Sequence, residues 1–234
     1  MRRLLLLSYL FFFLVQGLTA QKERVKNQPY ADMKLFHLGF HIGLHTQDLI
    51  LTNNGTTAPS GQTWFAEIPS YAPGFSVGVI GDMFVNPYLN LRLTPSIHFG
   101  DKQFVFKEYE NNTEYTTSVR SNYITMPLEL KYSSVRLNNY RPYLTGGVYG
   151  ALDVGRKKGE TLLLKSFDYG LSLGLGCDIY FSFFKLCPEI KFLFGLRDLI
   201  EKDRQDLIQP ELSMYTDALS RGTSRMIVLT FNFE

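Results

Sequence analysis

Eight segments of the chain alternate between apolar and polar side chains, and the apolar face of every segment carries no charge. In the segment 35–45, the even positions are Phe, Leu, Phe, Ile and Leu, whereas the odd positions after 35 are only His or Gly. Successive side chains of a β-strand point to opposite faces, so a period of two predicts strands with one apolar face. The eight predicted strands cover residues 35–45, 75–83, 89–99, 124–132, 144–154, 171–181, 184–196 and 227–233.

The opposite face of these strands is polar, and its charges balance. Five acidic and five basic side chains lie there among Ser, Thr, Asn, Gly and His: Asp82, Arg92, Glu129, Lys131, Asp153, Asp178, Lys185, Glu189, Lys191 and Arg197. This alternation fits a transmembrane β-barrel, whose apolar face meets lipid and whose polar face lines the lumen. It also fits a soluble β-sandwich, whose apolar face packs against a second sheet.

Three further features favour the barrel. The predicted connections are long at 46–73, 102–118, 155–167 and 198–223, and shorter at 84–88, 133–141 and 182–183, as outer loops and periplasmic turns are. The last predicted strand ends in the aromatic-rich sequence LTFNFE (229–234), which resembles the assembly signal of outer-membrane barrels. Aromatic residues gather near the short turns, where a membrane-interface girdle is expected: Tyr88, Tyr132, Tyr140, Tyr143, Phe181 and Phe184.

We therefore predict an all-β fold, an eight-stranded antiparallel transmembrane β-barrel. Eight strands enclose a lumen that side chains can fill, so no diffusive pore is expected. Charges in such an interior are costly unless they are paired. The interleaving of acids and bases, as at Glu129 and Lys131, predicts a lumen ionic cluster with a structural role. Glycines on the lumen face, such as Gly78 and Gly176, leave room for long partners across the barrel.

The first twenty residues have the features of a cleaved signal peptide. A basic start, an apolar run over 4–15 and a small-residue end at 17–20 predict cleavage before Gln21. The apolar run is shorter than the ~20 residues of a membrane-spanning helix. We expect a signal peptide (1–20), a short periplasmic segment (21–33) and a barrel domain (34–234) in the outer membrane of a Gram-negative bacterium.

Composition excludes other classes of protein. Hydrophobic residues make up 45% of the chain and charged residues 20%, which argues against disorder. Loss of Arg2 and Arg3 with the signal peptide leaves 22 basic against 22 acidic residues, so nucleic acid is not an expected partner. Cys177 and Cys187 fall on opposite faces of their strands, so no disulfide is predicted.

Histidines and serines invite a search for chemistry. His37, His41 and His45 share one face of the first strand, but residues four apart on a strand are separated by about 14 Å, whereas zinc ligands lie about 2 Å from the ion. The remaining alternative is a metal site that pairs one of these histidines with His98 across the barrel. Ser96 and His98 lie about 7 Å apart on one face, too far for a nucleophile and its base. No catalytic residue, metal, cofactor or enzymatic activity is expected.

Several segments resemble the PorT family of outer-membrane proteins. They are LRLTPSIHFG (91–100), ITMPLELKY (124–132), RPYLTGGVYGALD (141–153), GLGCDIYFSFFKLCPEIKFLFGL (174–196) and SRMIVLTFNFE (224–234). The resemblance runs from about residue 33 to the end, and the segment 174–196 is the most specific. It implies a component of the type IX secretion system, needed for export of cargo that bears a C-terminal sorting domain and, in some relatives, for gliding motility.

The partners that this resemblance implies are outer-membrane lipid and other secretion-system proteins. The protein would act by protein–protein contact rather than catalysis, and no small-molecule substrate is expected. The alternative is a general small outer-membrane barrel that binds ligands or surfaces through its extracellular loops, above all those at 46–73 and 198–223.

Overall fold

The computed structural model describes residues 26–53, 64–67, 73–108, 113–155, 164–201 and 219–234, so the predicted signal peptide (1–20) lies outside the described residues. A short 3-10 helix precedes the strands, and no helix of the described part is long and apolar enough to span a membrane. The elements are η1 (Ala31–Met33), β1 (Phe36–Asn53), β2 (Trp64–Glu67), β3 (Pro73–Asn86), β4 (Leu89–Leu93), β5 (Ser96–Glu108), β6 (Thr113–Ser133), β7 (Tyr140–Asp153), β8 (Phe167–Tyr180), β9 (Lys185–Gly195) and β10 (Leu219–Phe233).

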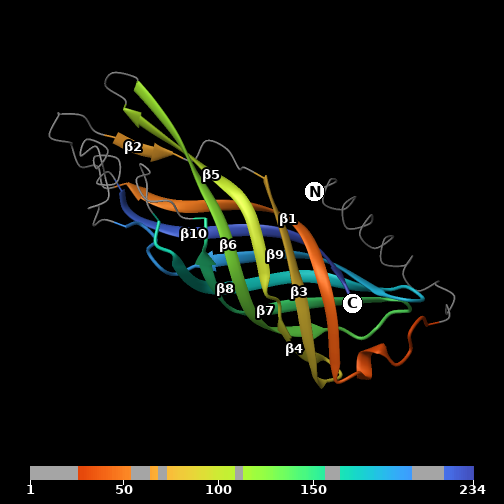
Figure 1. Cartoon of the computed structure of the whole chain (residues 1–234). Helices are drawn as coiled ribbons and strands as arrows, with labels where there is room; N and C mark the ends of the chain where they lie inside the picture. Colours follow the sequence, from red (N-terminus) through yellow and green to blue (C-terminus); the bar gives the residue numbers. More distant parts are fainter. Residues whose placement is uncertain (1–25, 54–63, 68–72, 109–112, 156–163, 202–218) are drawn as a thin grey trace, which may run out of the picture.

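The strands close into an antiparallel ring (Figure 1). β1 completes the ring because it pairs with β10 on one side and with β3 on the other. β4 and β5 are two halves of one barrel strand, since both pair with β3 and β6. With these halves counted together, the described ring has eight strands, and the short β2 is added at the far end of β5. The predicted eight-stranded barrel is confirmed.

The predicted strand 89–99 is interrupted at Thr94 and Pro95, between β4 and β5. Proline has no N–H to donate to a strand ladder, so regular pairing stops there. The neighbouring strands nevertheless stay joined across the break. The Val79 N–H donates to the Pro95 carbonyl at 3.0 Å, and the Thr94 N–H donates to the Pro127 carbonyl at 3.2 Å.

Strands run further than predicted at the end with the long connections. Most of the predicted loop 102–118 is strand, because β5 continues to Glu108 and β6 begins at Thr113. These two strands extend past the others, together with β2 (Figure 1). The alternation misses this extension because outside the lipid both faces of a strand meet water, whereas ladder hydrogen bonds continue. At the opposite end, the connections 87–88, 134–139 and 181–184 are short, as predicted.

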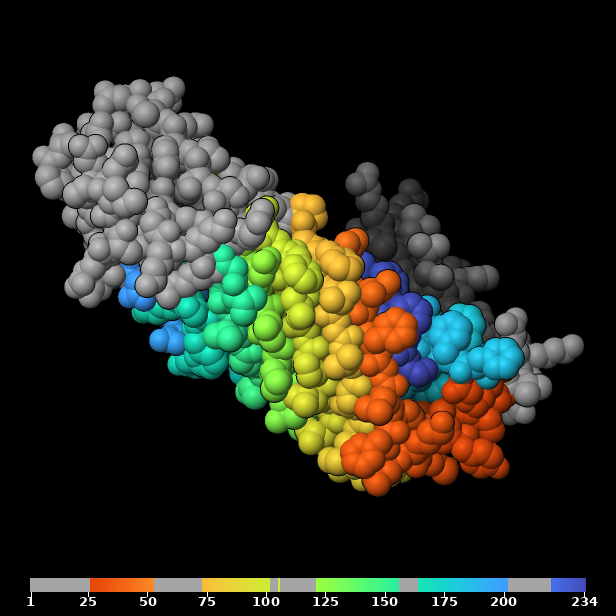
Figure 2. Space-filling model, in the orientation of Figure 1, coloured from red at the N-terminus to blue at the C-terminus, as the bar shows by residue number. Residues whose placement is uncertain are grey.

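Apolar side chains face outward and polar side chains face inward. Figure 2 shows one side of this outer wall, built by β1, β3, β5 and β6. Leu38 is 80% exposed, whereas Arg92, Ser121 and Ser172 are 0% exposed. Large apolar residues are exposed on every barrel strand, among them Leu38, Val79, Ile97, Leu128, Val148, Leu173, Ile190 and Leu229. Lipid requires this inside-out distribution, so the prediction of a polar lumen is confirmed.

Glycines on the lumen face make room for polar side chains of neighbouring strands. Gly78 of β3 lies between His41 of β1 and Ser96 of β5 in the ladder. A Cβ atom at Gly78 would lie 2.3 Å from His41 Nε2 and 2.4 Å from the Pro95 carbonyl oxygen. A side chain here would displace both the histidine and the backbone.

We predict that Gly78→Ala lowers the free energy of unfolding by about 1–3 kcal/mol, because it overpacks the interior. Gly81→Ala on the same strand is the matched control, since its Cβ would approach only Leu93 O, at 3.9 Å. Urea unfolding of the detergent-solubilised protein, followed by circular dichroism, gives both values. Equal stability of the two variants would contradict the packing described here.

Candidate functional site

Eight of the ten predicted lumen charges meet in one network inside the barrel, and a ninth residue, Glu234, joins them. The interior ionic cluster consists of Asp82, Arg92, Glu129, Lys131, Asp178, Lys185, Glu189, Lys191 and Glu234. None of these side chains is more than 9% exposed. Lys185 opens β9 and Glu234 follows β10, so the cluster reaches the end of the barrel with the short connections.

Arg92 is the centre of the cluster and binds three carboxylates. Its Nε and Nη2 atoms donate to Asp82 Oδ2 at 3.0 and 2.7 Å. Nη2 also donates to Glu234 Oε1 at 2.6 Å, and Nη1 donates to Glu189 Oε2 at 3.4 Å. The guanidinium group, with donors fixed in one plane, can join acids from three different strands in this way.

Two lysines share the carboxylate of Asp178. Lys131 Nζ lies 2.8 Å from both Asp178 oxygens, and Lys185 Nζ lies 4.0 Å from Oδ2. Lys185 also pairs with Glu234 Oε2 at 2.5 Å. These contacts connect the ends of β6, β8, β9 and β10, so each charge has a partner on another strand.

Lys191 extends the cluster toward the middle of the barrel. Its Nζ atom donates to Glu129 Oε2 at 2.7 Å and lies 3.3 Å from Glu189 Oε1. Glu189 also accepts hydrogen bonds from the Tyr143 hydroxyl at 2.9 Å and from Thr145 Oγ1 at 3.1 Å. The Glu189 carboxylate thus accepts from charged and neutral donors together, which offsets much of the free-energy cost of its desolvation.

The prediction that Tyr143 belongs to the membrane-interface girdle is wrong. Tyr143 is 3% exposed, its hydroxyl binds Glu189, and Lys131 Nζ lies 4.1 Å from its ring centroid. Gly176 gives the ring its space, because a Cβ there would lie 2.3 Å from Tyr143 Cζ. The other predicted girdle residues are exposed, namely Tyr88, Tyr132, Tyr140, Phe181 and Phe184.

Two of the predicted lumen charges lie outside the cluster. Arg197 is partly exposed, and its Nη1 donates to the Phe167 carbonyl at 3.1 Å. The sequence predicts a lumen position for Arg197 because this residue continues the alternation of the strand before it. In the structure β9 ends at Gly195, and the following residues leave the sheet. Asp153 is buried, and it accepts hydrogen bonds from Ser121 Oγ at 3.0 Å and from the Gly155 N–H at 2.9 Å.

The segment before β1 caps the short-connection end of the barrel. Asp32 of η1 pairs with Arg141 at 3.0 Å and with Arg136 at 3.7 Å, and it accepts a hydrogen bond from the Tyr180 hydroxyl. Asn27 Nδ2 donates to the Tyr180 carbonyl at 3.0 Å. Strand alternation contains no signal for this cap. The lumen position of Glu234, in contrast, can be predicted, because Glu234 is the next residue after Phe233 and therefore points to the opposite face of β10.

Ser96 forms no hydrogen bond with His98. Its hydroxyl donates to the Thr94 carbonyl at 2.8 Å, so His41 Nε2, also at 2.8 Å, is the donor to Ser96 Oγ. His98 Nε2 lies instead 3.0 Å from Thr125 Oγ1. The serine hydroxyl thus donates its hydrogen bond to a backbone carbonyl rather than to a histidine base.

The remaining candidates for chemistry are a histidine pair and two cysteines. The rings of His45 and His98 meet edge to face, with centroids 5.0 Å apart. Within the described part of the chain, no group of three or more His, Cys, Asp or Glu is placed to hold a metal ion. Cys177 and Cys187 are both free thiols.

Comparison with known families identifies the kind of barrel. The family described as "Outer membrane protein beta-barrel domain" matches residues 19–201. The chain belongs to this family. It is an integral protein of the outer membrane, and its apolar outer wall faces lipid. The family match is coarser than the PorT resemblance, because it is not specific to PorT proteins or to type IX secretion.

Solved structures of small outer-membrane barrels are similar to this family member. OprG from Pseudomonas aeruginosa has a TM-score of 0.48 and 13% identity over 84% of this chain and 92% of its own. Neisserial surface protein A has a TM-score of 0.42 and 12% identity over 85% of this chain and 98% of its own. AlkL has a TM-score of 0.38 and 13% identity over 92% of each chain. No curated protein matches the sequence.

We predict that Arg92→Met destabilises this outer-membrane barrel by about 3–5 kcal/mol, because three buried carboxylates lose their shared cation. Arg197→Met is the control, since among the described residues its cation contacts a carbonyl and the Phe167 ring rather than a carboxylate. Urea unfolding in detergent measures both. A loss below 1 kcal/mol for Arg92→Met would show that the pairing does not stabilise the fold.

The filled interior also predicts that the barrel conducts no steady ion current. Arg92, Lys131 and Glu189 are each at most 2% exposed, so the cluster leaves water little path along the barrel axis. Planar-bilayer recording of the reconstituted protein checks this. A stable, reproducible open channel would contradict it.

Proposed function

We propose that this barrel is an accessory component of the type IX secretion system, which assists protein export by contacting other secretion proteins and does not conduct cargo itself. The single observation that supports a contact role is the interior ionic cluster. A lumen filled by paired charges offers no route for a polypeptide. Export functions are therefore left to the outer surfaces and the two ends of the barrel.

The type IX part of the proposal rests on the PorT resemblance of the sequence. The most specific resembling segment, 174–196, contributes Asp178, Lys185, Glu189 and Lys191 to the interior ionic cluster. The resemblance in this segment thus concerns how the barrel is filled rather than what it contacts. A genetic test of export is needed to decide the role.

The short-connection end is the contact surface that we favour. Large apolar side chains are exposed on the cap and on the turns beside it: Tyr30 at 76%, Met33 at 75%, Leu137 at 65% and Phe183 at 97%. Exposed apolar groups that are gathered in one place often mark interaction sites. The cap is fixed to the barrel by Asp32, which would present Tyr30 and Met33 in a defined orientation.

Deletion of the gene is expected to block export of cargo proteins with a C-terminal sorting domain and to leave outer-membrane permeability normal. Immunoblots of culture supernatants measure export, and sensitivity to a large antibiotic measures permeability. The wild-type gene should restore export in the deleted strain. Unchanged secretion after deletion would overturn the proposal.

Complementation with cap variants locates the contact surface. Tyr30→Ser combined with Met33→Ser should reduce export, because it removes the exposed apolar groups without touching the interior ionic cluster. Lys26→Ser combined with Lys34→Ser, which changes exposed polar groups of the same segment, is the matched control. Equal export by both double variants, at equal protein levels, would exclude the cap as the contact surface.

A further inference from the structure

Two arginines lie on the outside of the barrel at the end with the long connections. Arg221 of β10 is exposed, and it has the parity of the exposed residues Ile227 and Leu229 of the same strand. Arg197, which follows β9, reaches the same outer surface. Its Cζ atom lies 6.0 Å from the centroid of the Phe167 ring, and Phe167 is 48% exposed. Neither guanidinium group therefore belongs to the interior ionic cluster.

The two guanidinium groups lie beside one backbone segment. Arg221 Nη2 donates to the Leu196 carbonyl at 3.1 Å, and Arg197 is the next residue of the chain. Arg197 Nη1 donates to the Phe167 carbonyl on the neighbouring strand, also at 3.1 Å. Both acceptors are neutral, and within the described ranges neither guanidinium forms an ion pair with a carboxylate. Because a guanidinium has five N–H donors, one carbonyl leaves most of them for an anion.

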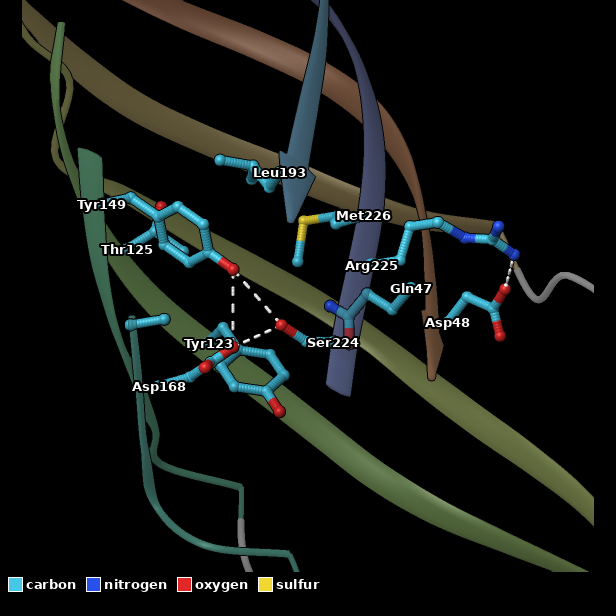
Figure 3. A pocket seen from close by; sticks show the side chains of 11 residues that line it. Gln47, Asp48, Tyr123, Thr125, Tyr149, Asp168, Leu193, Ser224, Arg225 and Met226 are labelled. Atoms are coloured by element: carbon cyan, nitrogen blue, oxygen red, sulfur yellow. Dashed lines mark hydrogen bonds and ion pairs between the residues drawn. The ribbon is translucent and has the colours of Figure 1, made fainter. Parts of the chain in front are cut away.

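Two acids at this end of the barrel are engaged elsewhere. Asp168 points into the barrel, where its Oδ2 atom accepts hydrogen bonds from the Tyr149 hydroxyl at 3.4 Å and from Ser224 Oγ (Figure 3). Asp48 of β1 forms an ion pair with Arg225 of β10, which Figure 3 also shows. Neither carboxylate neutralises the two outer arginines.

The chain beside the end of β9 adds one cation and two acids. Lys165 Nζ donates to the Asp198 carbonyl at 3.3 Å, so this charge also meets a neutral group. The Asp198 carboxylate accepts from the Gly222 N–H at 2.9 Å, which ties it to the backbone. Glu201 follows the β-bridge of Ile200 and is therefore farther from the lipid-facing wall. Three cations thus stand against two acids in the described residues beside the end of β9.

An apolar wall lies directly next to the two arginines. Tyr169 and Leu171 of β8 are exposed on the outer face, as are Phe194 of β9 and Leu196. Together with Phe167 they continue the outer wall that faces lipid. Aromatic side chains such as these are enriched where the hydrocarbon of a membrane meets its head groups. The arginines are therefore placed at the level of the head groups.

We propose that Arg197 and Arg221 bind the phosphate group of a lipid in the outer leaflet, the side of the long connections. The phosphate oxygens accept hydrogen bonds from both guanidinium groups, whose planar donors match phosphate geometry. The acyl chains lie along Tyr169, Phe194 and Leu196. A lipid fits better than free phosphate, because the arginines are continuous with the wall that faces lipid. The site adds to the proposed export function and does not rest on it.

The sequence predicts outer-membrane lipid as a partner without a head-group chemistry or a place. Alternation assigns Arg197 to the lumen, and Arg221 lies in the predicted loop 198–223. Only the hydrogen bonds to main-chain carbonyls beside β8 and β9 bring the two residues to one site.

Lipid binding to the purified full chain tests the head-group chemistry. The immobilised protein in non-ionic detergent is titrated with radiolabelled dioleoylphosphatidic acid or with dioleoylglycerol, which has the same acyl chains and no phosphate. Phosphatidic acid is expected to bind saturably and at least about tenfold more tightly, because it alone offers a charged acceptor. Equal binding of the two lipids, or no saturable binding, overturns the proposal.

Inorganic phosphate distinguishes a lipid site from a site for free anions. At a concentration equal to that of phosphatidic acid, inorganic phosphate is expected to leave the bound lipid in place, because it has no acyl chains to contact the wall. Displacement of the lipid by equimolar inorganic phosphate overturns the assignment to a lipid.

Variants test the residues. Arg197→Gln combined with Arg221→Gln is expected to weaken binding of phosphatidic acid at least about tenfold and to leave binding of dioleoylglycerol unchanged. Lys26→Gln combined with Lys34→Gln is the matched control, since it removes two exposed cations at the other end of the barrel. The band shift between unheated and boiled samples on a gel reports folding. Normal binding by the folded arginine variant, or an equal loss in the lysine variant, overturns the proposal.

Arg221→Gln alone decides the matter if the double variant does not fold, because it keeps the contact of Arg197 with β8. Loss of one of the two cations is expected to weaken binding of phosphatidic acid about threefold. Unchanged binding by the folded single variant overturns the proposal.

Discussion

The structure depends on the exclusion of water from the outside of a closed ring of strands. Hydrocarbon offers no partner to a backbone N–H or C=O group, so each group in the membrane must find one in a neighbouring strand. The pairing of β1 with both β3 and β10 meets this requirement, because it leaves the ring without an edge. Once the ring is closed, side chains alternate between lipid and lumen, and polar groups can only gather inside.

The interior ionic cluster follows from that inversion. A lumen of eight strands is too narrow for open water, so charges inside it must neutralise one another across strands. Arg92 joins Asp82, Glu189 and Glu234, and this fills the half of the barrel near the short connections. The half of the barrel near the short connections is therefore closed by paired charges, which supports the proposed role in contact rather than conduction.

The two halves differ in how their polar groups are satisfied. In the interior ionic cluster, Glu189 has partners on several strands, whereas Gln47 Oε1, in the half near the long connections, has none among the described residues. A buried polar atom that is left without a partner costs free energy. The cap beyond the cluster adds an anchored apolar surface that depends on Asp32.

The sequence by itself determined the strand class, the face of each strand and the short connections, because alternation is a local property that lipid and lumen impose on every strand. It also placed most of the charges of the interior ionic cluster in the lumen. Tertiary structure alone decided which charges pair, that Arg197 lies outside the lumen, and that the segment before β1 caps the barrel. These contacts join residues far apart in the chain, and their geometry depends on how the ring closes and on which glycines make room.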